Sequence, residues 1–204
     1  MKKKSNISGF SIIEVMISIF IFSMWMASIF MVISSSININ NLNKNQIIAS
    51  NLAREEIELI KNIRDSNYET FHKWNWIPNN DWINKYDSDK FLDIWKYYIL
   101  ENDFSSIEFP FKLKVINNFW EWESELKGKM LDYNLHLDSD NHYTYESIWN
   151  RKTIFYRYLF LEELKDSTWT IIPNTIKVKS KVIWYSKWYH EFEIKTILAD
   201  FNRL

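Results

Sequence analysis

The chain has 204 residues, a formal net charge of -1 and no cysteine, and 47% of its residues are hydrophobic. This composition suits one modest folded domain with an attached element. The charge lacks the strongly basic signature of nucleic-acid-binding proteins, and the lack of cysteine excludes disulfides, thiolate metal sites, cysteine nucleophiles and lipid attachment to cysteine.

The proportion of tryptophan to glycine is unusual. The chain has 11 Trp and 2 Gly, whereas average usage of about 7% would supply roughly a dozen glycines. Four tryptophans fall in predicted turns, where glycine is favoured because it adopts positive φ without steric cost: Trp74, Trp76, Trp82 and Trp188. Two interpretations stay open, an aromatic-rich protein from an AT-biased gene, or UGA codons that the source organism reads as glycine.

A short basic segment, MKKKSNISG (residues 1–9), precedes a long apolar run. No residue from Val15 to Ile33 is charged, and the only polar side chains there are serines. Together with residues 10–13, the run can span about 30 Å of hydrocarbon as a helix. Three lysines lie before the run and the next one after it is Lys44, so the positive-inside rule predicts a cytoplasmic N-terminus and an exported remainder.

A cleaved signal peptide and a plain signal anchor are alternatives for this segment. The run is longer than the roughly 7–15 apolar residues of a signal peptide, and SSSININN after it offers only a weak cleavage site. Neither alternative explains Glu14. A carboxylate costs about 2.5–3.5 kcal/mol at the centre of a bilayer and less near an interface, and a place in the first helical turn offsets part of that cost. A glutamate at the level of the lipid headgroups is therefore an alternative to a specific role.

The segment KKKSNISGFSIIEVMISIFIF resembles the N-terminal signature of type IV prepilins and type II secretion pseudopilins. The shared features are a basic leader, a glycine, a phenylalanine, a glutamate at the fifth position of the mature chain and an apolar helix. The resemblance implies that prepilin peptidase cleaves between Gly9 and Phe10 and N-methylates Phe10. It also implies that the Glu14 carboxylate pairs with the N-terminal amine of a neighbouring subunit, since an ion in an apolar filament core is tolerated only when paired.

A structural role follows from the resemblance: a minor pilin or pseudopilin, not an enzyme, in a type IV pilus, a competence pseudopilus or a type II secretion filament. The implied partners are prepilin peptidase, other subunits through the N-terminal helix, an inner-membrane assembly platform, and membrane lipid before assembly. No cofactor is expected, and nucleic-acid binding stays open. The expected location is the inner membrane as a single-pass protein, then the periplasm or cell surface. The alternative is a bitopic, signal-anchored extracytoplasmic binding protein unrelated to pili.

The expected organisation is a leader at 1–9, a transmembrane and filament-core helix at 10–33, its amphipathic continuation at 34–65, and an exported β-rich head at 66–204. In the continuation, apolar residues recur on one face at helical spacing: Ile48, Leu52, Leu59, Ile60 and Ile63. The charged residues between them are expected to be a solvated face, with pairing between subunits as the alternative: Arg54, Glu55, Glu56, Glu58 and Lys61.

The head is predicted to consist of short strands and loops. The segments FKLKVINNF, MLDYNLHL, HYTYES and TIFYRYLFLEEL have strand patterns, whereas residues 74–89 are rich in Asn, Asp and Pro and predict an irregular excursion. The clearest prediction is a C-terminal hairpin around a turn at Ser186–Trp188, with lysines on one strand facing glutamates on the other. Phe155, Tyr156, Tyr158 and Phe160 are expected to pack within a strand. The fold class is therefore α+β, a long N-terminal helix packed on an antiparallel sheet, without a predicted strand order.

No motif in the head predicts catalysis. The four histidines, His72, His136, His142 and His190, lack metal-ligand spacing. In LDSDNHY, the residues Asp138, Asp140 and Asn141 form a weak calcium candidate that lacks the glycine and the distal glutamate of an EF-hand loop, so a solvated turn is preferred. The segment EWESE (121–125) is expected to be an exposed acidic loop.

Overall fold

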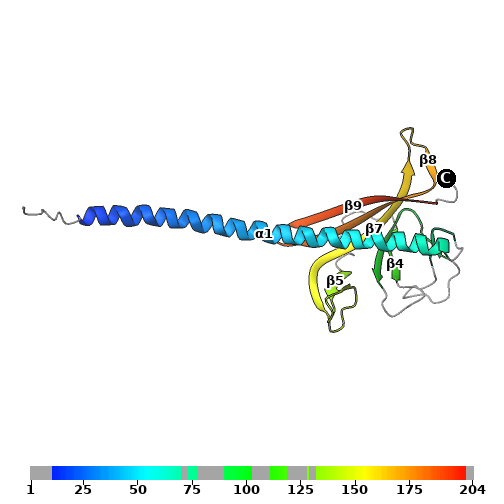
Figure 1. Ribbon diagram of the computed structural model, residues 1–204, viewed down its shortest axis with the longest axis horizontal. Coiled ribbons are helices and arrows are strands. Elements are labelled where there is room, and N and C mark those ends of the chain that lie inside the picture. The colour runs from blue at the N-terminus through cyan, green and yellow to red at the C-terminus, as the bar shows by residue number, and fades with distance from the viewer. Residues whose placement is uncertain are drawn as a thin grey trace, which may run out of the picture. The chain divides into compact units, whose positions relative to one another are not determined.

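The computed structural model describes residues 11–69, 73–77, 90–102, 111–118, 128 and 132–200. These residues form a long N-terminal helix and an antiparallel β-sheet, so the predicted α+β class is confirmed (Figure 1). Contacts divide the chain into two compact units, Met1–Asn45 and Gln46–Leu204. The helix α1 (Ile12–Glu69) continues about one turn beyond its predicted end.

The second half of α1 packs on the sheet through one face. Leu52, Ile60 and Ile63 are almost completely buried and Leu59 is 8% exposed, as their spacing predicts. Ala49 and Ala53, which the pattern of large apolar residues did not include, are fully buried on the same face. Small side chains at a contact permit close packing of a helix on its neighbours.

Nine strands are present among the described residues. They are β1 (Trp76–Ile77), β2 (Lys90–Phe91), β3 (Lys96–Asn102), β4 (Phe111–Asn118), β5 (Asn134–Leu137), β6 (Tyr143–Thr144), β7 (Arg151–Lys165), β8 (Ile171–Tyr185) and β9 (Tyr189–Ala199). The first two pair only with each other, and the other seven form one sheet in which every pairing is antiparallel.

Strand β7 is the centre of the sheet. It pairs with β8 along most of its length, and with β3 and β5 at successive positions of its other edge. Strand β4 extends the sheet from β3, β6 from β5, and β9 from β8. The β8–β9 pairing runs from Thr175↔Ala199 to Tyr185↔Tyr189 around residues 186–188, which confirms the predicted C-terminal hairpin.

Residues of β7 are buried on both faces of the sheet. All seven residues from Phe155 to Leu161 are buried, because the odd-numbered side chains face α1 and the even-numbered ones are covered by aromatic residues. The ring of Tyr97 stacks on Phe160 at 4.6 Å and meets Tyr158 edge-on at 5.6 Å. Strand packing of these aromatic residues is therefore confirmed.

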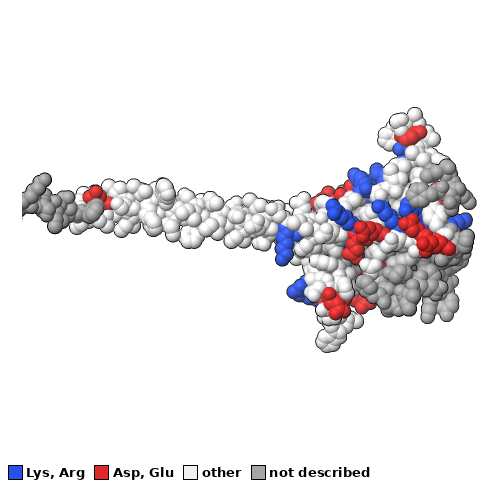
Figure 2. Space-filling view, in the orientation of Figure 1, with Lys and Arg blue, Asp and Glu red and all other residues white. Residues whose placement is uncertain are grey.

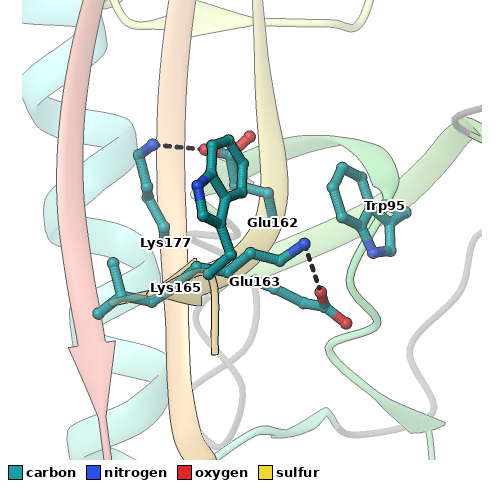
Figure 3. A pocket seen from close by; sticks show the side chains of 7 residues that line it. Trp95, Glu162, Glu163, Lys165 and Lys177 are labelled. Atoms are coloured by element: carbon teal, nitrogen blue, oxygen red, sulfur yellow. Dashed lines mark ion pairs between the residues drawn. The ribbon is translucent and has the colours of Figure 1, made fainter. Parts of the chain in front are cut away.

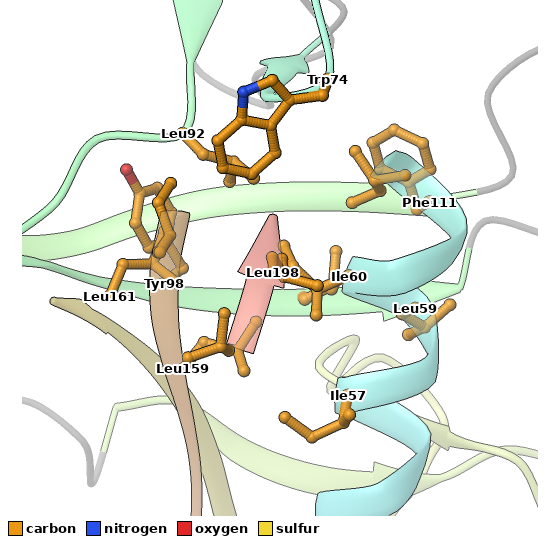
Figure 4. Packing of buried hydrophobic residues seen from close by; sticks show 14 residues of the cluster. Ile57, Leu59, Ile60, Trp74, Leu92, Tyr98, Phe111, Leu159, Leu161 and Leu198 are labelled. Carbon is orange, nitrogen blue, oxygen red and sulfur yellow. The ribbon is translucent and has the colours of Figure 1, made fainter. Parts of the chain in front are cut away.

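The core between α1 and the sheet is aliphatic near the C-terminal end of α1. Ile57 and Ile60 of the helix lie in one buried cluster with Leu159 and Leu161 of β7, among other residues (Figure 4). Burying an aliphatic side chain of this size contributes about 1.5–3 kcal/mol, so this cluster is the main source of attachment between α1 and the sheet.

A buried polar cluster lies farther along the same contact. Arg157 of β7 is fully buried, and its guanidinium donates hydrogen bonds to the carbonyl oxygens of Leu52 (3.3 Å) and Leu100 (2.9 Å). It also forms an ion pair with Glu55 at 3.1 Å. A charged group can occupy a protein interior only with such partners, and here they come from α1 and β3.

The prediction that the charged residues of α1 form a solvated face is wrong for Glu56. Its side chain is fully buried, its Oε2 accepts a hydrogen bond from the Ser180 hydroxyl (2.6 Å), and its Oε1 lies 3.9 Å from Arg157 Nε. Glu56 follows Leu52 by four residues and precedes Ile60 by four, so it lies on the buried stripe. Burial raises the pKa of Glu56 to about 8, although Arg157 and the Ser180 hydroxyl oppose that rise.

Charged side chains are interspersed on the surface of the head (Figure 2). The predicted pairing between hairpin strands is confirmed for Lys181 and Glu191, whose charged atoms lie 2.9 Å apart. Lys177 and Lys179 instead each pair at 2.6 Å with Glu162 of β7, because β8 lies between β7 and β9.

Candidate functional site

The start of α1 brings together two residues of the N-terminal motif, Ser11 and Glu14. Ser11 Oγ accepts a hydrogen bond from the backbone N–H of Ile13 (3.3 Å), and the Ser11 carbonyl accepts one from Glu14 N–H (3.0 Å). Ser11 is therefore the N-cap of the helix. Ser11 and Glu14 have the S-x-x-E spacing of a capping box, a signal that the sequence interpretation of Glu14 did not use.

Glu14 lies in the first turn of α1 and is exposed. A negative charge is favourable there because the free N–H groups of a helix N-terminus carry partial positive charge. Within the described residues, no side chain forms an ion pair or hydrogen bond with its carboxylate. Ser11 and Ser18, its polar neighbours on the described helix, use their hydroxyls on backbone groups, and its other neighbours there are apolar.

The serines of the apolar segment are satisfied within the helix. The hydroxyls of Ser18, Ser23 and Ser28 donate to the carbonyl oxygens of Glu14 (2.7 Å), Ile19 (2.8 Å) and Met24 (3.1 Å) respectively. Each bond reaches back four residues, as serine hydroxyls in helices do. The helix therefore presents few unsatisfied polar groups to an apolar environment, which is a requirement inside a membrane.

The apolar side chains of this segment have no partner within the described residues. Every described residue from Ser11 to Lys44 is exposed, and the large hydrophobic ones up to Ile33 range from 38% exposed at Met26 to 79% at Ile12. By length and composition, α1 is able to cross a membrane. A contiguous apolar surface of this kind is stable only when lipid or other apolar helices cover it. The segment is thus consistent with a single-pass membrane-anchored protein.

The weak calcium candidate lies in the loop between β5 and β6. Asp138 Oδ1 accepts hydrogen bonds from the backbone N–H groups of Asp140 (2.9 Å) and His142 (2.8 Å), and its Oδ2 lies 3.3 Å from His142 Nδ1. The backbone bond from His142 is the main reason that the pKa of Asp138 is lowered. These bonds stabilise a tight turn in which Asn141 has φ 66°.

The histidines lie in different settings. His190 of β9 stacks on Trp184 at 5.3 Å and pairs with the Ser186 hydroxyl at 3.0 Å, whereas His136 lies in β5.

Several predictions concern positions outside the described residues: Gly9, Phe10, His72, Trp82, most of 74–89, and 121–125.

A cavity of about 260 Å³ lies beside the end of β7 (Figure 3). Its charged lining residues pair with one another, Lys177 with Glu162 at 2.6 Å and Lys165 with Glu163 at 3.7 Å. Two indole rings, Trp95 and Trp169, complete its wall. This lining does not combine a nucleophile with a base, so the cavity does not suggest a reaction.

One comparison with known proteins gives a match. The family model for the prokaryotic N-terminal methylation motif matches residues 4–30. The matched region includes Gly9, Phe10, Glu14 and most of the apolar segment, and the head lies outside it. No curated protein and no solved structure matches the chain. The resemblance recognised in the sequence is therefore confirmed for the N-terminal segment.

Proposed function

We propose that this chain, which carries the prepilin signature of type IV pilins and pseudopilins at residues 4–30, is a structural subunit of a filament assembled from such proteins. The observation that carries the proposal is the coincidence of this motif with an apolar helix segment whose side chains are all exposed from Ser11 to Lys44. In the membrane, lipid covers this surface. In a filament, the corresponding segments of other subunits cover it.

Processing would prepare the chain for assembly. Cleavage between Gly9 and Phe10, followed by N-methylation, makes Phe10 the first residue, one position before the N-cap Ser11. Glu14 then follows the new amine by four positions in the chain. Each mature subunit carries a positive group and a negative group four residues apart in the sequence.

This separation suggests how subunits are placed relative to each other. If the amine of one subunit meets the Glu14 carboxylate of the next, the two helices are offset along the filament axis by a fixed step. An unpaired charge buried in an apolar core is destabilising by about 3–5 kcal/mol relative to the paired state. The pairing therefore favours one axial offset over others that leave Glu14 without a cation.

The finer assignment follows the branch resemblance of the helix. We infer a minor subunit of a type IV pilus, a competence pseudopilus or a type II secretion filament, with prepilin peptidase and an inner-membrane assembly platform as partners. The leader lysines support a cytoplasmic N-terminus and an extracytoplasmic head. After assembly the head would lie in the periplasm or at the cell surface.

The test replaces the Glu14 carboxylate while keeping its shape. Full-length chains with Glu14→Gln, or with the exposed Glu58→Gln as a control, are produced in the source organism. The mature N-terminus and the partition between membrane and sheared filament fractions are then measured. We expect both variants to be cleaved, with only Glu14→Gln depleted from filaments, by tenfold or more at the penalty given above. Incorporation of Glu14→Gln at the level of Glu58→Gln would contradict the pairing role.

A further inference from the structure

Positive φ angles are concentrated at tryptophans. Five described non-glycine residues have φ between 56° and 66°: Trp95, Asn141, Trp149, Trp169 and Asn174. Asparagine tolerates this left-handed region, whereas a bulky side chain there is a genuine outlier. We propose that positions 95, 149 and 169 are glycines in the native protein, encoded by UGA codons that the source organism reads as glycine. The proposal is independent of the filament function.

The β7–β8 loop gives the strongest support, because the β5–β6 loop repeats its geometry. In the β5–β6 loop, Asp138 N–H donates to the His142 carbonyl (3.1 Å) and Asn141 N–H donates to the Asp138 carbonyl (3.2 Å). In the β7–β8 loop, the bonds from Asp166 to Thr170 and from Trp169 to Asp166 are 3.0 and 3.1 Å.

The aspartate that begins each loop also makes the same side-chain hydrogen bonds in both loops. Asp166 Oδ1 accepts from the backbone N–H groups of Thr168 (2.8 Å) and Thr170 (2.9 Å), as Asp138 Oδ1 accepts in the other loop. The fourth position has φ 66° at Asn141 and φ 62° at Trp169. A hairpin loop of this type ends with a left-handed residue, most often glycine, in a β-bulge. One loop thus uses asparagine where the other is assigned tryptophan.

At positions 149 and 169, exposure removes the usual reason for a tryptophan. The side chain of Trp169 is 82% exposed, and that of Trp149, at φ 64°, is 101% exposed. Neither gains the burial that could offset backbone strain. Trp95 has φ 60° in the turn before β3, where its N–H donates to the Leu161 carbonyl at 2.7 Å. Its half-buried ring lies edge-on to Phe160 at 6.2 Å, but the backbone conformation and the hydrogen bond need no side chain, so φ carries the assignment at position 95.

Other tryptophans behave as genuine aromatic residues. Trp184 is 4% exposed and Trp74 is 9% exposed in the main core, and neither has a positive φ. Trp74 was one of the turn positions that suggested glycine in the sequence, and its burial argues against that assignment. Trp188, in the β8–β9 turn, is 77% exposed but lacks a positive φ.

The substitution changes the surface of the head. The cavity in Figure 3 loses both of its indole walls when residues 95 and 169 are glycines, which is a further reason not to assign it a ligand. The exposed indoles at 149 and 169 also disappear, so they do not mark a docking surface for a partner.

Native protein provides the decisive test. The chain is purified from the source organism, digested with trypsin and analysed by mass spectrometry, and the codons are read from the gene. The informative peptides are residues 91–96, 130–151 and 166–177, and the control is peptide 182–187, which contains Trp184. We expect glycine masses and UGA codons for the first three peptides, and tryptophan with UGG at 184. Tryptophan at 95, 149 and 169 in the native peptides would overturn the proposal.

A stability measurement tests the structural reasoning separately. The full-length chain is produced from a synthetic gene with tryptophan or glycine at each position, and its thermal midpoint is measured in detergent. At the exposed positions 149 and 169, relief of left-handed strain should raise the midpoint by about 2–8 °C for each replacement, whereas Trp184→Gly should lower it. A lowered midpoint for Trp169→Gly would contradict the correspondence between the two loops.

Discussion

Glu56 provides a stability prediction whose sign depends on its burial. In the unfolded chain its carboxyl has an ordinary pKa near 4.5, whereas burial in the folded head raises that pKa to about 8. Between pH 4.5 and pH 8, Glu56 therefore keeps its proton in the folded protein, whereas it has released that proton in the unfolded chain. Stability from this group is fully present below pH 4.5 and is lost as the pH rises toward 8.

The magnitude follows from the two pKa values. A single group contributes a slope of at most about 1.4 kcal/mol per pH unit, so the free energy of unfolding should fall by at most about 3.5 kcal/mol between pH 5 and pH 8. Arg157 favours the ionised form, and its effect is already included in the pKa of about 8. Glu56→Gln mimics the protonated carboxyl at every pH, so it should be close to wild type at pH 5 and more stable at pH 8.

The assay is denaturant unfolding of the full-length chain in detergent, followed by tryptophan fluorescence at several pH values. The difference between wild type and Glu56→Gln cancels the titration of other groups. Glu58→Gln, which changes an exposed carboxylate two residues away, is the control and should keep the wild-type pH dependence. A pH dependence of Glu56→Gln equal to that of wild type would refute the claim that Glu56 is protonated by burial.

Three further predictions test the attachment of α1 to the sheet and the ion pairs between β7 and β8. Arg157→Met should lower the free energy of unfolding by about 3–5 kcal/mol because it leaves buried partners unsatisfied. The control Arg151→Met changes an exposed residue and should alter that free energy by less than about 0.5 kcal/mol. Equal effects of the two substitutions would contradict the role of Arg157 in the buried cluster. Ile60→Ala should lower the free energy of unfolding by about 2–5 kcal/mol, whereas Ile47→Ala, at an exposed position, should change it little. Equal small effects would show that the helix does not pack on the sheet in solution. Glu162→Gln should lower the free energy of unfolding by about 0.2–1 kcal/mol for each of its two lysine partners. The loss should be smaller at high salt, because salt screens exposed charges. A loss that does not change with salt would exclude the ion pairs as its cause.

Local patterns predicted much of the head correctly. The alternation of apolar and charged residues identified the C-terminal hairpin and its turn, because side chains in a strand alternate between the two faces of a sheet. Helical spacing identified Leu52, Ile60 and Ile63 as buried. Both predictions depend only on neighbours in the sequence.

Features that depend on distant contacts were not predicted. The strand order places β8 between β7 and β9, which is why Glu162 takes the lysines expected to face β9. The sequence places Glu56 on the solvated face, because no pattern of neighbouring residues reveals a partner about a hundred positions away, Arg157. A charged residue on an apolar stripe is a usable signal, but only knowledge of the partner converts it into a buried pair.

The central claim concerns the N-terminal motif, and the mass of the mature N-terminus tests it most directly. The chain is isolated from cells that contain prepilin peptidase, and its N-terminal peptide is analysed by mass spectrometry. We expect a chain that begins with N-methylated Phe10 and lacks residues 1–9. A chain that retains its leader in such cells would exclude processing at Gly9 and favour a permanently signal-anchored protein.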